Sequence, residues 1–279
     1  MSSSERWPHF LGMLDVLGLN EAPLAVFFSD AAPEKGLTPD PLPLPTREAE
    51  IANQVNWGEI FGGFSCVMGH IWRARRKNVP AYFSAENFGC LGGAFYLGFN
   101  KPQVETIIQY VSTGVPNFME GECYLDSPDA FRAILEYVDP IPAPRKYLVV
   151  KPLHLLADDE QPDHVMFFAR PEALAGLHQL ASYVTGAAEA VRSPFGAACS
   201  AVMAWPYHYQ ARGIETAVLG GWDPSARKYF RPDELSFTVP RSMFDRMAAT
   251  WRESFLTKKA WKEARRKVDL SRRTWNKSK

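Results

Sequence analysis

The sequence predicts an α/β or α+β protein, with a mixed sheet flanked by helices and a basic helix at its C-terminal end. Three observations predict this fold. Segments with helical periodicity alternate along the chain with short apolar runs that are typical of buried strands. Clusters of proline and glycine separate these segments. The length of 279 residues is that of one or two domains. The composition, 46% hydrophobic and 22% charged, excludes a disordered, collagen-like or disulfide-stapled chain.

The first half of the chain is expected to begin with an amphipathic helix over residues 6–19, because Phe10, Leu14 and Leu17 recur at helical spacing. Ser127 is the expected N-cap of a later helix, and Pro128 its first residue. The remaining expected elements are a strand at 24–28, a proline-rich loop at 33–45, a helix at 57–77, a strand at 80–84, a glycine-rich turn entering a short helix at 87–98, and helices at 102–113 and 127–138.

The second half follows a proline-rich linker at residues 140–144. Gly186 is expected to end one helix, because glycine adopts the left-handed conformation common at helix C-termini. An uncharged run at 193–211 contains two prolines, so it is expected to be core and not a membrane span. The expected elements are strands at 147–150, 164–168, 215–219 and 235–239, a helix at 171–185, and helical structure from 240 to near the end.

Residues 1–250 are expected to form a single domain, and residues 251–279 a basic, tryptophan-containing helical extension. Two similar halves, 1–140 and 145–250, are an alternative division. Each half has a five-residue apolar run shortly after a proline, at 24–28 and at 164–168. These runs suggest an internal duplication.

The charge of the chain is unevenly distributed. The whole chain has 31 basic and 31 acidic residues, but residues 257–279 contain ten basic residues against Glu263 and Asp269. This tail is expected to dock on the acidic body of its own chain or of a second copy, or to contact a partner protein. Nucleic acid is not an expected partner, because Trp251, Phe255 and Trp261 have the spacing of a packed helix face. The first residues lack a basic segment followed by an apolar core, so the cytoplasm is the expected location.

The four cysteines, Cys66, Cys90, Cys123 and Cys199, are the main candidates for chemistry. They are widely spaced and form no Cys-x-x-Cys motif, so neither a zinc ribbon, a thioredoxin motif nor a ferredoxin run is present. Four separate reduced thiols packed as small hydrophobic groups are one interpretation.

The neighbours of the cysteines favour a second interpretation. Cys66, Cys90 and Cys199 each lie among glycines or other small residues. Such residues allow close approach of the backbone and expose amide groups, which metal–sulfur clusters use as hydrogen-bond donors. Gly89, Gly92 and Gly93, which surround Cys90, are therefore the expected cofactor-binding glycines.

Two further pairings are open. Cys66 and His70 are four residues apart and would share one helix face, where they could hold a metal ion or His70 could bond to a neighbour. Glu120 and Glu122 precede Cys123 and could supply an acid, a base or an oxygen ligand near that thiol. The sequence names no catalytic residue, because it contains neither a phosphate-binding loop, a nucleophile elbow nor a His-Glu-x-x-His motif.

Several short segments in order resemble the family known as domain of unknown function 169, whose members are uncharacterised bacterial and archaeal proteins. The segments span about residues 15 to 250, and are Pro23-Leu-Ala-Val-Phe27, Phe64-Ser-Cys66, Gly89-Cys-Leu-Gly-Gly-Ala94, Pro162-Asp-His-Val165, Phe195-Gly-Ala-Ala-Cys199 and Asp233-Glu-Leu-Ser-Phe-Thr-Val-Pro240. The resemblance implies cysteines at positions 66, 90 and 199 and a further one near 220–227. This chain has Trp222 there, so Cys123 or another ligand would have to complete a four-ligand set.

Three hypotheses follow. The favoured one is a thiolate–metal protein, with an iron–sulfur cluster held by Cys66, Cys90 and Cys199, and Cys123 or an external molecule as fourth ligand, in a redox or Lewis-acid role. The second is a cofactor-free module that binds a small molecule in an aromatic pocket, or regulates a partner. The third is an enzyme that uses Cys90 as a nucleophile at a helix N-terminus.

Overall fold

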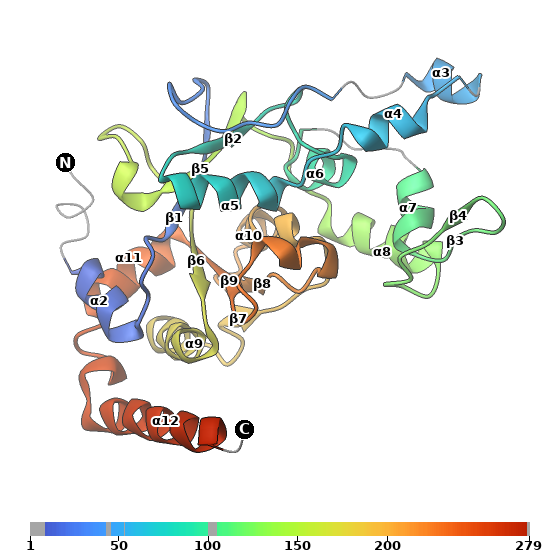
Figure 1. Ribbon diagram of the computed structural model, residues 1–279. Coiled ribbons are helices and arrows are strands. Elements are labelled where there is room, and N and C mark those ends of the chain that lie inside the picture. The colour runs from blue at the N-terminus through green and yellow to red at the C-terminus, as the bar shows by residue number, and fades with distance from the viewer. Residues whose placement is uncertain (1–8, 43–45, 53, 100–104, 278–279) are drawn as a thin grey trace.

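A computed structural model describes residues 9–42, 46–52, 54–99 and 105–277 of the chain. Its centre is a seven-stranded sheet with the strand order β2-β5-β1-β6-β9-β8-β7 (Figure 1). All neighbouring strands are antiparallel except β7 and β8, which are parallel. The strands are β1 (Leu24–Ser29), β2 (Ala81–Phe83), β5 (Tyr147–Pro152), β6 (His164–Ala169), β7 (Val191–Arg192), β8 (Ala217–Gly220) and β9 (Leu235–Pro240). The predicted mixed sheet is confirmed.

Helices surround this sheet. The α-helices of the described chain are α2 (Phe10–Leu17), α3 (Arg47–Ile51), α4 (Trp57–Gly62), α5 (Val67–Lys77), α6 (Leu91–Tyr96), α7 (Glu105–Val111), α8 (Pro128–Val138), α9 (Pro171–Thr185), α10 (Ala204–Ala211), α11 (Arg241–Thr250) and α12 (Lys259–Lys277). The short 3-10 helices are η1 (Leu153–Leu155), η2 (Ala198–Ala201), η3 (Pro224–Tyr229) and η4 (Phe255–Thr257). None of the helices in the described ranges is long and apolar enough to cross a membrane.

The strands are buried on both faces, and their side chains alternate between two hydrophobic cores. In β1, Ala25 and Phe27 join the core under α2, α9 and α11, whereas Leu24 and Val26 join the opposite core. That opposite core lies under α5, α10 and η2. Figure 1 shows the strands between α9 and α11 on one side and α5 and α10 on the other. Cys66 and Cys199 lie on the side of α5 and η2.

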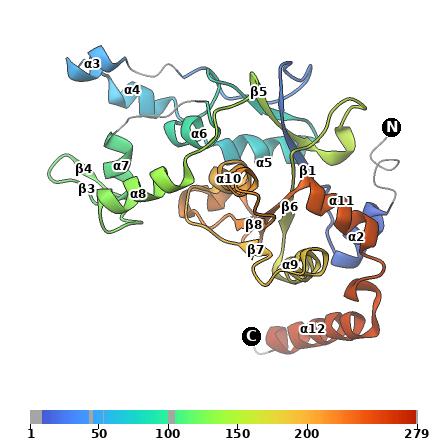
Figure 2. The ribbon, with the colours of Figure 1, turned by 180° about the vertical axis from the view of Figure 1, so that it is seen from behind.

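A smaller lobe extends from one end of the sheet. It contains α7, α8 and a two-stranded ribbon of β3 (Gly114–Val115) and β4 (Met119–Glu120). Helix α7 contacts both α8 and β3. Figure 2 shows this lobe from behind, beyond α6 and α10. Ser127 caps α8 as expected, since its hydroxyl accepts the amide hydrogen of Ala130 at 3.3 Å.

The basic helix α12 lies along the outside of α9 at the C-terminal end of the chain (Figure 1). The ring of Trp261 reaches Gly176 of α9 and packs edge-on against Phe255. Arg265 donates a hydrogen bond to the carbonyl oxygen of Leu17 at 3.1 Å, and Arg272 forms an ion pair with Glu172. The tail therefore docks on its own chain, through a tryptophan and two arginines.

Three predicted helices have different limits in the structure. The single helix expected at 57–77 was wrong, because α4 ends at Gly62 and α5 begins after Cys66, whose backbone is extended. The helix expected from 240 onward is interrupted by η4 between α11 and α12. Helix α2 starts at Phe10, and residues 6–8 and 102–104 of the predicted helices lie outside the described residues.

The two proposed halves share one sheet. Strand β1, from residues 1–140, lies between β5 and β6, from residues 145–250. The two apolar runs that suggested a duplication, in β1 and β6, pair directly with each other. The duplication itself stays a prediction.

Candidate functional site

Three of the four cysteines converge from separate segments. Cys66 is the N-cap of α5, Cys90 is the N-cap of α6, and Cys199 lies in η2. Both α5 and α6 contact η2. A negative charge on Cys66 would raise the pKa of Cys90, and charges on both would raise the pKa of Cys199. The three thiols therefore lie within range of one another's charges.

Glycines allow the backbone segments that carry Cys66 and Cys90 to pack closely. The amide of Ser65 donates a hydrogen bond to the carbonyl oxygen of Gly89 at 2.8 Å. Gly89 has φ +83°, and a Cβ atom there would lie 2.4 Å from the carbonyl oxygen of Ser65. A Cβ on Gly93 would lie 2.4 Å from the carbonyl oxygen of Phe88. Only glycine fits both positions without displacing the backbone.

Backbone amides point at two of the sulfur atoms. The amide of Gly93 donates to Cys90 Sγ at 3.3 Å, and the amides of Met68 and Gly69 stabilise the thiolate form of Cys66. Gly89 and Gly93, expected to bind a cofactor, thus have packing and amide-donor roles in the turn. Gly92 lines the cavity beside the thiols, and a Cβ atom on it would meet Cys90 Sγ at 4.0 Å and otherwise open space.

Burial dominates the acid–base chemistry of the cluster. Burial raises the pKa of Cys90 to about 11, although the amides of Gly93 and Gly92 oppose it. Burial also raises the pKa values of Cys66 and Cys199. At neutral pH the three thiols are protonated in the absence of a cation. The nucleophile hypothesis for Cys90 requires a thiolate at neutral pH, and the high pKa argues against it.

Asp223 is the residue at this site that the sequence analysis missed. One carboxylate oxygen accepts the amide and hydroxyl hydrogens of Ser225 at 2.9 and 2.7 Å, and the other accepts the amide hydrogen of Ala198 at 3.2 Å. The carboxylate thus joins the N-termini of η2 and η3, and its charge raises the pKa of all three thiols. The Asp-Pro-Ser sequence at 223–225 is a helix-start signal that could have identified it.

A cavity of about 480 Å³ opens beside the thiols, between the small lobe and η3. Its walls are mainly apolar and aromatic, and they include the buried Tyr96. Burial, Cys199 and Asp223 all raise the pKa of Tyr96. The lining residues are Gly92, Tyr96, Ile107, Val111, Glu122, Tyr124, Phe131, the segment 193–197, and the segment 222–225. A small molecule in this cavity would lie against Gly92, next to Cys90.

The structure also places the other two predicted ligands, Cys123 and His70. Cys123 is exposed in the segment after β4, where its amide donates to the carbonyl oxygen of Ser112 at 2.9 Å. His70 bonds through Nε2 to the hydroxyl of Ser65 at 3.2 Å, which is the neighbour-bonding alternative. Within the described ranges, no group of three or more His, Cys, Asp or Glu side chains is spaced to hold a metal ion.

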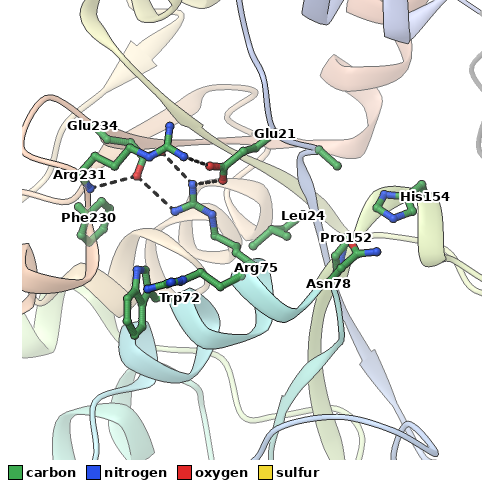
Figure 3. Close-up of a pocket in the computed structure, with 12 residues that line it drawn as sticks. Glu21, Leu24, Trp72, Arg75, Asn78, Pro152, His154, Phe230, Arg231 and Glu234 are labelled. Atoms are coloured by element: carbon green, nitrogen blue, oxygen red, sulfur yellow. Dashed lines mark hydrogen bonds and ion pairs between the residues drawn. The ribbon is translucent and has the colours of Figure 1, made fainter.

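A larger cavity, of about 670 Å³, lies elsewhere, between α5 and the segment before β9 (Figure 3). Its polar wall is a charge network. Arg75 binds both carboxylate oxygens of Glu234, at 2.8 and 3.3 Å, and also Glu21, which pairs with Arg231. The guanidinium of Arg75 lies 3.6 Å from the ring centre of Phe168. These charges satisfy one another and fasten three segments together, so we assign this wall a structural role.

The fold and site define a class of protein: a mixed α/β domain whose cysteines meet beside an aromatic cavity. A family model described as DUF169, "Uncharacterised ArCR", matches residues 13–250, and the chain belongs to that family. Helix α12 lies beyond the matched residues. No curated protein and no solved structure gives a significant match.

Proposed function

We propose that Cys66, Cys90 and Cys199 bind a metal centre through their thiolates, and that an iron–sulfur cluster is the favoured centre. The observation that carries the proposal is the convergence of three thiols from three segments, with backbone amides directed at two of them. Soft thiolate ligands select zinc, copper(I) and iron–sulfur clusters. A centre of this kind supplies electron transfer or Lewis-acid chemistry when it is bound.

Cysteines from separate segments of a chain can together hold an iron–sulfur cluster. A cluster distributes its thiolates over several iron atoms, so its ligands lie farther apart than those of one ion. A molecule in the cavity would lie against Gly92, beside Cys90, and could complete a set of three protein ligands.

The protein's own residues prepare this site in two ways. The amides of Gly93, Gly69 and Met68 supply hydrogen bonds to sulfur, which stabilise thiolates once a cation has displaced their protons. The high pKa values of the thiols mean that binding releases protons, so affinity for the metal rises with pH through the neutral range.

The test is the iron, zinc and acid-labile sulfide content of the full chain purified without oxygen, with its visible spectrum. We expect iron, sulfide and a broad brown absorbance in the wild type and in the matched control Cys123→Ser. Each of Cys66→Ser, Cys90→Ser and Cys199→Ser should lose them while circular dichroism stays unchanged. If zinc is found without sulfide, the centre is a single zinc ion bound by thiolates and the iron–sulfur cluster is wrong. A metal-free, colourless wild type would overturn the whole proposal.

A second candidate function is a cofactor-free module that binds or senses a small molecule. The aromatic cavity of about 480 Å³ favours it, because ligand pockets of this size are commonly apolar with a few polar groups. The triple variant Cys66→Ser/Cys90→Ser/Cys199→Ser separates the two functions. Unchanged folding and unchanged ligand binding in that variant favour the cofactor-free module.

We also propose a cytoplasmic location and a contact to a second copy or another protein through α12. The four cysteines are free, as they are in a reducing compartment. Leu270 and Trp275 are 45% and 75% exposed on α12, among its basic residues. Sedimentation of the wild type and of Trp275→Ala tests the contact, since loss of the tryptophan should lower any self-association.

A further inference from the structure

The charged groups in the cavity beside the thiols all carry the same sign. Of the residues that line it, Glu122 and Asp223 are ionisable acids, and no lysine, arginine or histidine of the described chain lines it. The two basic side chains of η3 are engaged elsewhere: Arg227 donates to the carbonyl oxygens of Gly221 and Glu234, and the exposed Lys228 lies 5.3 Å from the ring centre of Tyr229. The cavity is therefore an acidic site with apolar walls.

Neither carboxylate is neutralised by a cation of the described residues. Asp223 accepts its hydrogen bonds from Ser225 and from the amide of Ala198, which are uncharged donors. Glu122 accepts hydrogen bonds from the hydroxyl groups of Tyr110 and Tyr124. Burial and the charge of Asp223 raise the pKa of Glu122, so a cation between the two acids would relieve an unfavourable interaction.

Aromatic rings supply most of the remaining wall. Tyr124, Phe131, Phe195 and Trp222 come from four different positions in the chain and line the same space. The indole N–H of Trp222 donates to the hydroxyl of Ser193 at 2.7 Å, which fixes a ring that is 56% exposed. Aromatic faces attract cations through their quadrupole, most strongly for tryptophan.

We propose that this cavity binds an organic ammonium ion, either a protonated amine or a methylated one. Its alkyl groups would lie against the aromatic rings, and its charge near Glu122 and Asp223. An anion would meet two carboxylates, and a neutral apolar molecule would leave both acids uncompensated. That the ion binds follows from the cavity alone. That it would be a substrate of the metal centre rests on the proposed function.

The experiment measures binding of choline and of benzyltrimethylammonium by calorimetry and by tryptophan fluorescence. The matched controls for choline are 3,3-dimethylbutan-1-ol, which has the same shape without charge, and 3,3-dimethylbutanoate, which is an anion. We expect both cations to bind, with the affinity for choline at least tenfold above that for the alcohol and no binding of the anion. Equal affinity for choline and the alcohol, or failure of both cations to bind, would overturn the proposal.

Two variants locate the binding. Glu122→Gln should weaken choline binding about tenfold, whereas Glu120→Gln, at an exposed position of β4 that does not line the cavity, should leave it unchanged. Equal effects of the two variants would contradict the assignment. Trp222→Leu gives a second reading, because it removes a ring at an exposed position and should also weaken binding without unfolding the protein.

The same titration on metal-free protein and on the triple cysteine-to-serine variant separates this inference from the proposed function. Choline binding that persists there supports the ammonium site even if no metal is found. A metal-containing wild type that binds neither cation overturns the ammonium site alone.

Discussion

The position of Cys90 shows how two local effects compete at one residue. A helix N-terminus stabilises a thiolate, and the sequence predicted Cys90 at such a position. The structure confirms the position, since the amide of Gly93 donates to its sulfur. Burial is the larger effect, however, and raises the pKa to about 11. The thiol is therefore protonated at neutral pH and unsuited to act as a free nucleophile.

Alkylation should reveal this difference between cysteines. In metal-free protein at pH 7.5, iodoacetamide should modify the exposed Cys123 first, and Cys90 at least about 100-fold more slowly. The rate at Cys90 should rise about tenfold per pH unit toward pH 11, because only the thiolate reacts. Peptide mapping by mass spectrometry measures both rates.

The variant Cys123→Ser is the control for that experiment, and it should remove the fast phase. Alkylation of Cys90 at the same rate as Cys123 at pH 7.5 would contradict the prediction and restore the nucleophile hypothesis.

His164 should make the protein sensitive to acid. It is fully buried in β6 against Tyr207, neither ring nitrogen has a hydrogen-bond partner in the described chain, and burial lowers its pKa to about 3. In the unfolded chain His164 binds a proton near pH 6.5, whereas in the folded chain it stays neutral down to about pH 3. Stability should therefore fall as the pH drops below 6.5, by about 2 kcal/mol between pH 8 and pH 5.

Urea unfolding at pH 8, 6.5 and 5 measures this effect. His164→Leu should flatten the pH dependence by about one proton. His178→Gln, at an exposed position of α9, should leave the dependence as it is in the wild type. The same pH dependence in His164→Leu and the wild type would show that another group is responsible.

At the scale of elements, the strands were predictable and the break between α4 and α5 was not. Apolar runs such as 24–28 and 164–168 correspond closely to β1 and β6, because a strand buried on both faces is apolar throughout. The helix expected at 57–77 is interrupted because Ser65 bonds to Gly89, a residue 24 positions away. Sequence periodicity reports local structure and carries no information on such a contact.

The candidate site was predictable to a similar degree. Cys66, Cys90 and Cys199 were identified from their small neighbours, which permit close packing of the turns. Asp223 was not, because its importance depends on the distance to Ala198. Glu122 was identified beside Cys123, but only the folded lobe turns it toward Asp223 and the cavity.

The charge network at the larger cavity should fasten the segment before β9 to α5. The side chains of Arg75 and Glu234 are only 8% and 5% exposed, so removing the charge of Glu234 takes one of two acidic partners, Glu234 and Glu21, from a buried arginine. Glu234→Gln should therefore lower the free energy of unfolding by about 3 kcal/mol, as measured by urea denaturation.

The matched control is Asp30→Asn. It removes the partner of Arg145 in a pair whose side chains are 57% and 75% exposed, so it should cost less than about 1 kcal/mol. Equal losses of unfolding free energy in the two variants would mean that the buried network stabilises the fold no more than a surface ion pair does.

At the scale of the whole molecule, α12 is an accessory to the matched family domain. It lies beyond residue 250 but packs against α9 through Trp261, while Trp275 faces outward with 75% of its surface exposed. Trp261→Ala should lower the free energy of unfolding by about 2 kcal/mol, because it removes apolar contacts with the core.

Trp275→Ala should change that free energy by less than about 0.5 kcal/mol, since surface substitutions have small effects. Thermal unfolding followed by circular dichroism compares the two variants. Equal effects would show that the packing of α12 on α9 does not stabilise the domain.

The insertion of β1 between β5 and β6 determines when the chain can fold during its synthesis. Residues 24–29 leave the ribosome first, yet both of their partner strands are made more than 100 residues later. Cys66 and Cys90 are likewise made long before Cys199, which lies in the last third of the chain. Their apolar segments stay unpaired in the meantime, which is when chaperones are most needed. A site that needs all three thiols is therefore complete only after residue 199 has been made.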